Sequence, residues 1–278
     1  MAESNKTSRK DVANLWKLLS STDQTLVDQG LAIAESLGAP MEPLLEGLSV
    51  NERTGEIIRN ARFTGTRENQ RQLDRVLLHQ LSLAEPDSPA GKLRASIRKV
   101  SIEVDVIPNL RGFFGLETVE VVLTAPENIN TAESFSDLGL FGEMPALRML
   151  TIRAETLSRT HKTLESLQGL DAPKLESVML ANLGLRDIEP LGKAHGLKVV
   201  DLSGNPGLES IAGLKRSAAT LERLDLSGCA ALESLDPLQG ATQIKVALLE
   251  GCGRIPSLKP LARCQQLTEE ALSGRCAI

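Results

Sequence analysis

Aromatic side chains are scarce in this sequence of 278 residues, which has no tyrosine, one tryptophan and five phenylalanines. Hydrophobic residues nevertheless make up 41% of the chain. A core of this composition must be filled by Leu, Ile, Val and Ala, and an aliphatic core of that kind suits regularly stacked, repeated layers. The shortage of aromatics also removes the surfaces on which bases of single-stranded nucleic acids stack.

An excess of positive charge is also missing, because the formal net charge is -5. A nucleic-acid binder needs Lys and Arg to neutralise phosphates, so we expect no nucleic-acid partner. The first ten residues are polar and no long apolar stretch follows them. We therefore expect neither a signal peptide nor a membrane span, and we predict a cytoplasmic location.

Motifs that carry chemistry are lacking too. There is no convincing Gly-rich phosphate loop and no Gly-x-Ser-x-Gly nucleophile elbow. The histidines have no metal-ligand spacing, and the cysteines form no Cys-x-x-Cys pair: His79, His161 and His195; Cys229, Cys252, Cys264 and Cys276. We predict no metal site, no cofactor and no enzymatic activity. A cysteine enzyme whose catalytic partners meet only in the fold stays open as an alternative.

A short phrase recurs from Leu147 onward, at intervals of 22 to 28 residues. Its copies are LRMLTI, LESVML, LKVVDL, LERLDL and IKVALL, with a weaker copy, LTEEAL, from Leu267. Each follows the pattern apolar-x-x-apolar-x-apolar, although Ala247 and Glu270 weaken the last two. The alternation predicts short strands with one covered face, and repetition at this period predicts parallel stacking of successive units.

Three residues after the last strand leucine stand Asn205, Cys229 and Cys252. A polar side chain at this turn can hydrogen-bond the backbone of neighbouring coils, so we interpret these residues as rungs of a structural ladder. Metal binding or catalysis by the cysteines is the alternative. Cys276 falls one place off this register.

The second half of each repeat has leucines or isoleucines at three-residue spacing, as in Leu232, Leu235 and Leu238. This spacing predicts a 3₁₀-like turn, in which residues three apart eclipse. A proline precedes the last leucine in three repeats, which favours a compact segment over a long helix: Pro190, Pro237 and Pro260.

The runs LDLSGNPGLESIAGL, LDLSGCAALESLDPL and LANLGLRDIEPL resemble leucine-rich repeats. They are most similar to the short-repeat subclass of internalin-type and phosphatase-regulator proteins, and the resemblance covers about 147–276. It implies an α/β leucine-rich-repeat solenoid, a horseshoe with a parallel sheet on its concave face and partner binding there. Cys replaces Asn at two rungs, and the first repeat is irregular.

The part before the clear repeats has another character. We predict a flexible N-terminus at 1–10, a helical region or cap at 11–90 and a leucine-rich-repeat domain at 91–278. Helices are expected at 11–19, 26–37, around 44–48 and at 67–84. Strand-like segments that start near Ile97 and Leu116 are either degenerate first repeats or an N-terminal extension of the sheet. The insertion at 124–145, with Phe135 and Phe141, is either a packed loop or helix or a partner-contacting projection.

The predicted helix at 67–84 carries an arginine-rich face with Arg67, Arg71 and Arg75. A solvated helix face is one interpretation. The other is a basic docking patch for an acidic partner or an anionic lipid.

The outward positions of successive strands are the predicted binding surface for a protein partner of unknown identity: Met149, Thr151, Met179, Asp201, Arg223, Asp225, Val246 and Leu248. Val246 and Leu248 form an exposed aliphatic pair in this interpretation, and an apolar spot among charges suits protein binding. We therefore predict an intracellular adaptor or regulator. The alternative is an assembly protein that self-associates through its N-terminal helices or its C-terminal edge.

Overall fold

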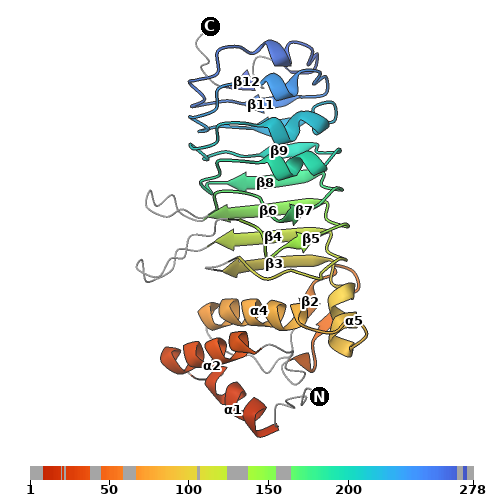
Figure 1. Ribbon diagram of the computed structural model, residues 1–278, viewed down its shortest axis with the longest axis vertical. Coiled ribbons are helices and arrows are strands. Elements are labelled where there is room, and N and C mark those ends of the chain that lie inside the picture. Colours follow the sequence, from red (N-terminus) through yellow and green to blue (C-terminus); the bar gives the residue numbers. More distant parts are fainter. Residues whose placement is uncertain are drawn as a thin grey trace, which may run out of the picture.

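An eight-stranded sheet runs the length of the repeats (Figure 1). The computed structural model describes residues 9–19, 21, 23–37, 45–58, 67–104, 107–123, 137–154, 164–267 and 272–273. All strands of this sheet are parallel and lie in the order of the sequence: β3 (Lys99–Val104), β4 (Thr118–Leu123), β6 (Met149–Ala154), β8 (Ser177–Ala181), β9 (Val199–Asp201), β10 (Arg223–Asp225), β11 (Val246–Leu248) and β12 (Leu272–Ser273).

Burial alternates along the strands, as the repeat pattern predicts. In β4, Val119, Val121 and Leu123 are buried, while the residues between them are partly exposed. The register places inward side chains of neighbouring strands side by side, as with Val178 beside Val200. Each layer of aliphatic side chains therefore packs on the next, and the core needs few aromatics.

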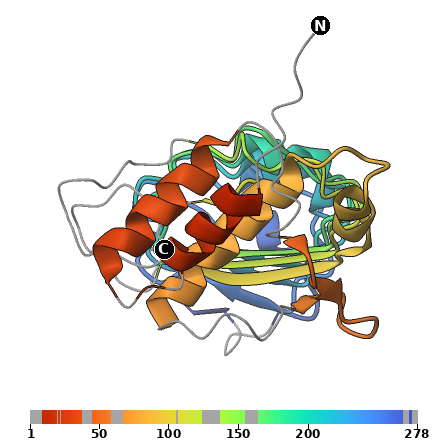
Figure 2. The ribbon, with the colours of Figure 1, turned by 90° about the horizontal axis from the view of Figure 1, so that it is seen from below.

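Short backing segments face the sheet across this core (Figure 2). Four 3₁₀ segments, three of them with proline in the first turn, confirm the predicted compact turns: η2 (Glu189–Lys193), η3 (Ala212–Ser217), η4 (Asp236–Leu238) and η5 (Lys259–Leu261). The earlier coils are backed instead by a two-stranded parallel sheet, β5 (Gly142–Glu143) with β7 (Leu170–Asp171).

Helices occupy the N-terminal end of the stack (Figure 1). Val76, Leu77 and Leu81 of α4 are buried, and α4 lies against β3, the first strand of the sheet. The elements of this region are α1 (Arg9–Leu19), α2 (Gln24–Ser36), the antiparallel pair β1 (Ser49–Val50) and β2 (Ile57–Ile58), α4 (Arg67–Ser82) and α5 (Pro89–Ser96). The sequence analysis missed α5 and the β1–β2 pair.

Several boundaries differ from those expected. Arg9 and Lys10 already belong to α1, whereas the rest of the predicted flexible start lies outside the described residues. The predicted boundary between the helical region and the repeat domain, at 90/91, falls inside the helix α5. Of the predicted third helix, around 44–48, residue 44 lies outside the described residues. Phe141 is fully buried, which favours the packed interpretation for its part of the insertion; Phe135 lies outside the described residues.

The last repeat has a different register from the one expected. Alignment of the phrases places Glu270 beside Ala247, but Ala247 pairs with Leu272. The segment between Leu267 and β12 is therefore two residues longer than in the preceding repeat.

Candidate functional site on the exposed face of the sheet

The register brings the predicted binding residues into two rows on the uncovered side of the sheet. One row crosses six strands through Ser101, Glu120, Thr151, Met179, Asp201 and Asp225 and ends at Leu248. We call it the central row. A neighbouring row contains Met149, Arg223 and Val246. All eight residues predicted from the sequence thus share this face.

Exposure along the rows is uneven. Met149 and Met179 are each 37% exposed and stand among the few large hydrophobic side chains that face solvent in the described residues. Val246 and Leu248 are only partly exposed, so the expected exposed aliphatic pair is wrong. The methionines, rather than the aliphatic pair, supply the apolar part of the surface.

Asp201 and Asp225 have a structural task that the sequence analysis missed. Asp201 Oδ1 accepts hydrogen bonds from Ser203 N at 2.9 Å and Ser203 Oγ at 2.6 Å. Asp225 Oδ1 accepts from Ser227 N at 2.9 Å. Both carboxylates therefore hold the turn that follows their strand. The repeated Asp-x-Ser spacing was the signal for this role.

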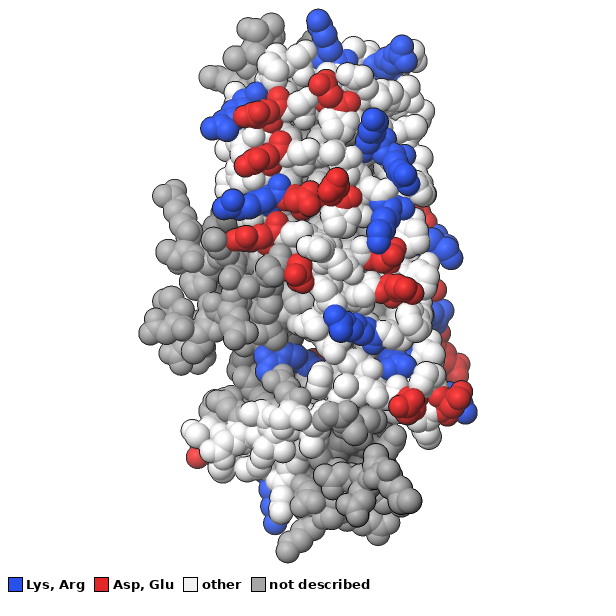
Figure 3. Space-filling model, viewed as in Figure 1, with Lys and Arg blue, Asp and Glu red and all other residues white. Residues whose placement is uncertain are grey.

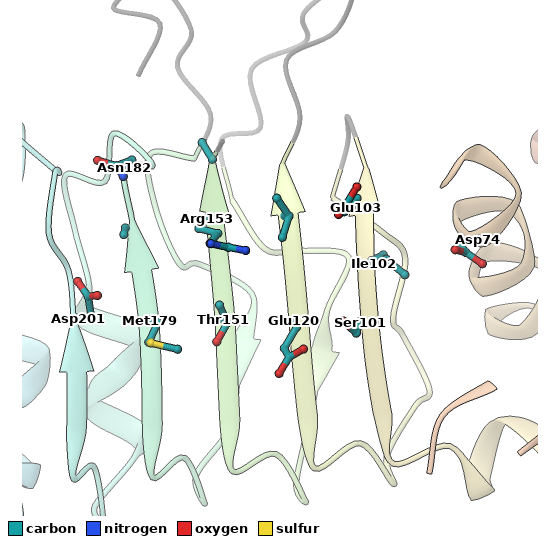
Figure 4. Close-up of a pocket in the computed structure, with 13 residues that line it drawn as sticks. Asp74, Ser101, Ile102, Glu103, Glu120, Thr151, Arg153, Met179, Asn182 and Asp201 are labelled. Atoms are coloured by element: carbon teal, nitrogen blue, oxygen red, sulfur yellow. The ribbon is translucent and has the colours of Figure 1, made fainter. Parts of the chain in front are cut away.

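A hollow of ≈ 840 Å³ opens over the N-terminal half of this face, between α4 and β9 (Figure 4). The central row from Ser101 to Asp201 crosses it, and Asp74 of α4 stands at its end. Glu103 and Arg153 line it one row further along their strands. We call this space the face hollow. The sequence analysis missed Asp74, Glu103 and Arg153, since it considered only two outward positions per strand and did not place α4 beside the sheet.

The face hollow has an acidic balance. Among its lining residues, four carboxylates and one guanidinium leave a formal charge of -3: Asp74, Glu103, Glu120, Asp201 and Arg153. Lys99 lies beside the hollow, with Nζ 3.1 Å from Glu56 and 3.7 Å from Glu120. Its hydrogen bond to Glu56 is the main cause that raises the pKa of Lys99. Elsewhere, on the face shown in Figure 3, charges of both signs are interspersed.

Cys229 and Cys252, for which metal binding or catalysis was the alternative role, belong to the ladder of turn residues. Asn205 is fully buried; its Nδ2 donates to Leu180 O and Leu202 O at 2.7 Å each, and its Oδ1 accepts from two backbone N–H groups. Cys229 Sγ donates to Leu202 O, and Cys252 Sγ donates to Leu226 O. Both cysteines therefore act as rungs, as interpreted from the sequence.

Burial makes Cys229 a poor nucleophile, because desolvation raises the pKa of its thiol to about 12. Cys264 belongs to a second set of rungs: its Sγ donates to Ala241 O, as Ser217 Oγ donates to Ala194 O two coils earlier. Cys276 lies outside the described residues. No group of three or more His, Cys, Asp or Glu side chains is placed to hold a metal within the described residues.

The predicted arginine patch is only partly described. Arg67 and Arg71 belong to α4, but their side chains lie outside the described residues. Arg75 is partly buried, so at least one member does not lie on a fully solvated face. The docking patch stays a prediction.

A ladder of alternating charges at the start of the strands was also missed. The residue after the first leucine or isoleucine of each phrase alternates in sign along the stack: Arg98, Glu117, Arg148, Glu176, Lys198, Glu222 and Lys245. Glu176 pairs with Arg148 and, at 2.9 Å, with Lys198; Glu222 pairs with Lys245 at 2.6 Å. Alignment of the phrases would have revealed this alternation.

Parallel strands in sequence order, 3₁₀ backing and a buried asparagine rung together decide the fold type. The fold is of the leucine-rich-repeat type. No protein-family model matches this leucine-rich-repeat chain, and no curated protein matches it. None of the helices in the described part combines the length and apolar character that a membrane crossing requires.

Two solved structures with distant similarity are internalins of Listeria monocytogenes. Internalin C2 shares 15% identity and a TM-score of 0.36, over 72% of this chain and 92% of that chain. Internalin InlF shares 14% identity and a TM-score of 0.27, over 73% of this chain and 77% of that chain.

Proposed function

We propose that this chain is a non-catalytic interaction module, built as a leucine-rich-repeat solenoid, that binds a protein partner through the exposed face of its sheet. The observation that carries the proposal is the arrangement of that face. The strands present aligned side chains to solvent, while the described helices lie at one end and the 3₁₀ segments on the opposite side (Figure 2). A large surface held by a rigid sheet is available for a partner.

The chemistry of the face supports a protein ligand. Exposed methionines adapt to irregular apolar surfaces, and here Met149 and Met179 stand among charged and hydroxyl side chains. An apolar centre with polar surroundings is the usual anatomy of a protein interface. Such a surface is sufficient for an adaptor or regulator, which binds its partner without modifying it chemically.

Two double variants, one on this face and one elsewhere on the surface, test where the partner binds. Met149→Lys/Met179→Lys places two cations on the face without removing a hydrogen bond of the turns. The matched control is Phe114→Lys/Leu140→Lys, which changes two side chains that are 54% and 41% exposed beside β5, away from this face. Affinity capture from the native cell extract, read by mass spectrometry, should lose a partner with the first variant and keep it with the second.

The proposal would be overturned by partners that both variants retain equally, or that only the control loses. Circular dichroism and thermal unfolding of each variant must match the original protein, so that loss of binding is not loss of fold.

Self-association is the second candidate, and one observation favours it. Within the described residues, β12 pairs only with β11, so its other edge is available to another strand. Light scattering after size exclusion, at several protein concentrations, tests this: a dimer that persists in Met149→Lys/Met179→Lys supports assembly, whereas a monomer at all concentrations contradicts it.

A further inference from the structure

We infer that the face hollow recognises an extended segment of the partner that carries two cationic side chains four residues apart, with an uncharged residue midway between them. This inference rests on the proposed function and adds the chemistry of the partner. It follows from three features of the hollow: its charge, the spacing of its carboxylates and the groups between them.

The two carboxylates of the central row are the first feature. Glu120 and Asp201 lie on β4 and β9, three strand spacings apart through β6 and β8. Neighbouring strands are about 4.8 Å apart, so these rungs are separated by roughly 14 Å. At that distance one cation cannot neutralise both, but two cations on one ligand can.

The spacing selects the conformation of the ligand. An extended chain advances about 3.4 Å per residue and turns every second side chain to the same side, so residues i and i+4 face the sheet about 14 Å apart. An α-helix needs about nine residues to cover that length, and it then presents the second side chain on its opposite face. A segment that crosses the strands in extended conformation therefore fits both carboxylates.

Both carboxylates keep oxygen atoms for a ligand. The two hydrogen bonds to Ser203 use Oδ1 of Asp201, and Oδ2 accepts none within the described residues. Glu120 shares Lys99 with Glu56, and the contact of Lys99 with Glu56 is the shorter one at 3.1 Å against 3.7 Å. Lys99 can remain with Glu56 when a ligand cation approaches Glu120.

The middle of the row supplies an apolar contact and a hydrogen-bond donor. Met179 exposes 37% of its surface there. Thr151 Oγ1 is shielded from solvent and has no hydrogen-bond partner in the part of the chain that the structure describes. Rotation of the Thr151 side chain about χ1 would turn this hydroxyl into the hollow, where a backbone carbonyl of a crossing peptide can accept its hydrogen bond, since buried polar groups are normally paired.

Arg153 sets the identity of the middle residue. Its side chain points toward β4, beside the centre of the row (Figure 4). A third cation at position i+2 would meet this guanidinium, so the hollow favours an uncharged residue at that place.

Two labelled peptides of equal composition test the spacing by fluorescence anisotropy at low salt. Gly-Lys-Ser-Val-Ser-Lys-Gly has lysines four residues apart, and Gly-Lys-Val-Ser-Lys-Ser-Gly has them three apart. The inference predicts tighter binding of the first peptide. The protein variant Glu120→Gln/Asp201→Asn should weaken that binding about tenfold, because each exposed ion pair contributes up to about a fivefold effect.

Asn at position 201 keeps Oδ1 as the acceptor of the turn, so this variant removes charge and leaves the fold intact. The matched control is Glu117→Gln/Asp187→Asn, which removes two negative charges outside the hollow. Asp187 Oδ1 accepts from Glu189 N at 2.8 Å, a hydrogen bond to the backbone two residues on like that of Asp201 but at the start of η2, and Glu117 precedes the same strand as Glu120. This control should bind the first peptide as tightly as the original protein.

Equal affinity for the two peptides, equal loss in both double variants or no measurable binding of either peptide would overturn the inference. The Met149→Lys/Met179→Lys capture experiment then reports separately on the proposed function. If that variant loses a partner and the peptide test fails, the proposed binding face is supported and only the inference of a dibasic ligand is rejected.

Discussion

At the residue scale, Asn205 differs from the cysteines at the equivalent turns. Its side chain forms four strong hydrogen bonds with backbone groups of two coils, whereas the thiols of Cys229 and Cys252 donate weaker hydrogen bonds to Leu202 O and Leu226 O. The position directly before each rung is also constrained, because the chain passes through left-handed backbone there, with φ of 61° at Asn182 and 70° at Gly204. Asparagine and glycine tolerate that conformation best.

Replacing Asn205 by alanine should lower the free energy of unfolding by about 3 kcal/mol, because it leaves buried N–H and C=O groups without partners. Urea unfolding measures the change. The matched substitution Cys229→Ala removes a thiol, whose hydrogen bonds are weaker than those of an amide, and should cost about 1 kcal/mol. Equal losses for the two variants would contradict the ladder described here.

The thiol of Cys229 should resist alkylation in the folded protein. Burial raises its pKa to about 12, so at pH 8.5, where a free cysteine is about half ionised, it remains a neutral thiol. Iodoacetamide followed by peptide mapping should label Cys229 only after unfolding in urea. Rapid labelling of the native chain at pH 8.5 would show that this position is open to solvent.

At the scale of elements, ion pairs between alternating charges connect the residues that directly precede neighbouring strands. Glu176 lies between Arg148 and Lys198, and the hydrogen bond from Lys198, followed by that from Arg148, lowers the pKa of its carboxyl. Because the pKa of Glu176 is lower in the folded state, the ion pairs stabilise the folded protein fully at pH values above the unfolded pKa near 4.5. This stabilisation is lost as the pH falls through the folded pKa.

Glu176→Gln should therefore lower the midpoint of urea unfolding at pH 7 and low salt. The difference from the original protein should shrink in 1 M NaCl, where exposed charges are screened within about 3 Å. It should also shrink as the pH falls below 4.5 and through the lowered pKa of the folded state, because the carboxyl is then protonated in both states. A difference that is unaffected by salt and pH would assign the role of Glu176 to packing.

Elements with strong periodicity were predictable, and elements fixed by distant contacts were not. The phrases from Leu147 to Leu249 gave β6 and β8 to β11, and the three-residue spacing gave the 3₁₀ segments, because each repeat has nearly the same surroundings. The two-residue strands β1, β2 and β12 and the helix α5 have no such signal. β12 depends on its pairing with β11, so its register could not be inferred from the weak phrase at Leu267.

At the scale of the whole molecule, the candidate surface was partly predictable. Alternation alone placed Met149, Met179 and the other outward residues on one face, since side chains of a strand point to opposite sides. The face hollow was not predictable, because α4 and strands as far as β9 line it together, and Asp74 and Asp201 lie more than a hundred residues apart in the sequence. Asp74 becomes part of the surface only through this contact.

The claim that a protein partner binds the exposed face is tested most directly by photocrosslinking. A benzoyl-phenylalanine introduced at Met179 should crosslink the partner in native extract, because this side chain stands in the middle of the central row. The same probe at Phe114, which is exposed beside β5, should not. A partner that crosslinks from position 114 and not from position 179 would contradict the account.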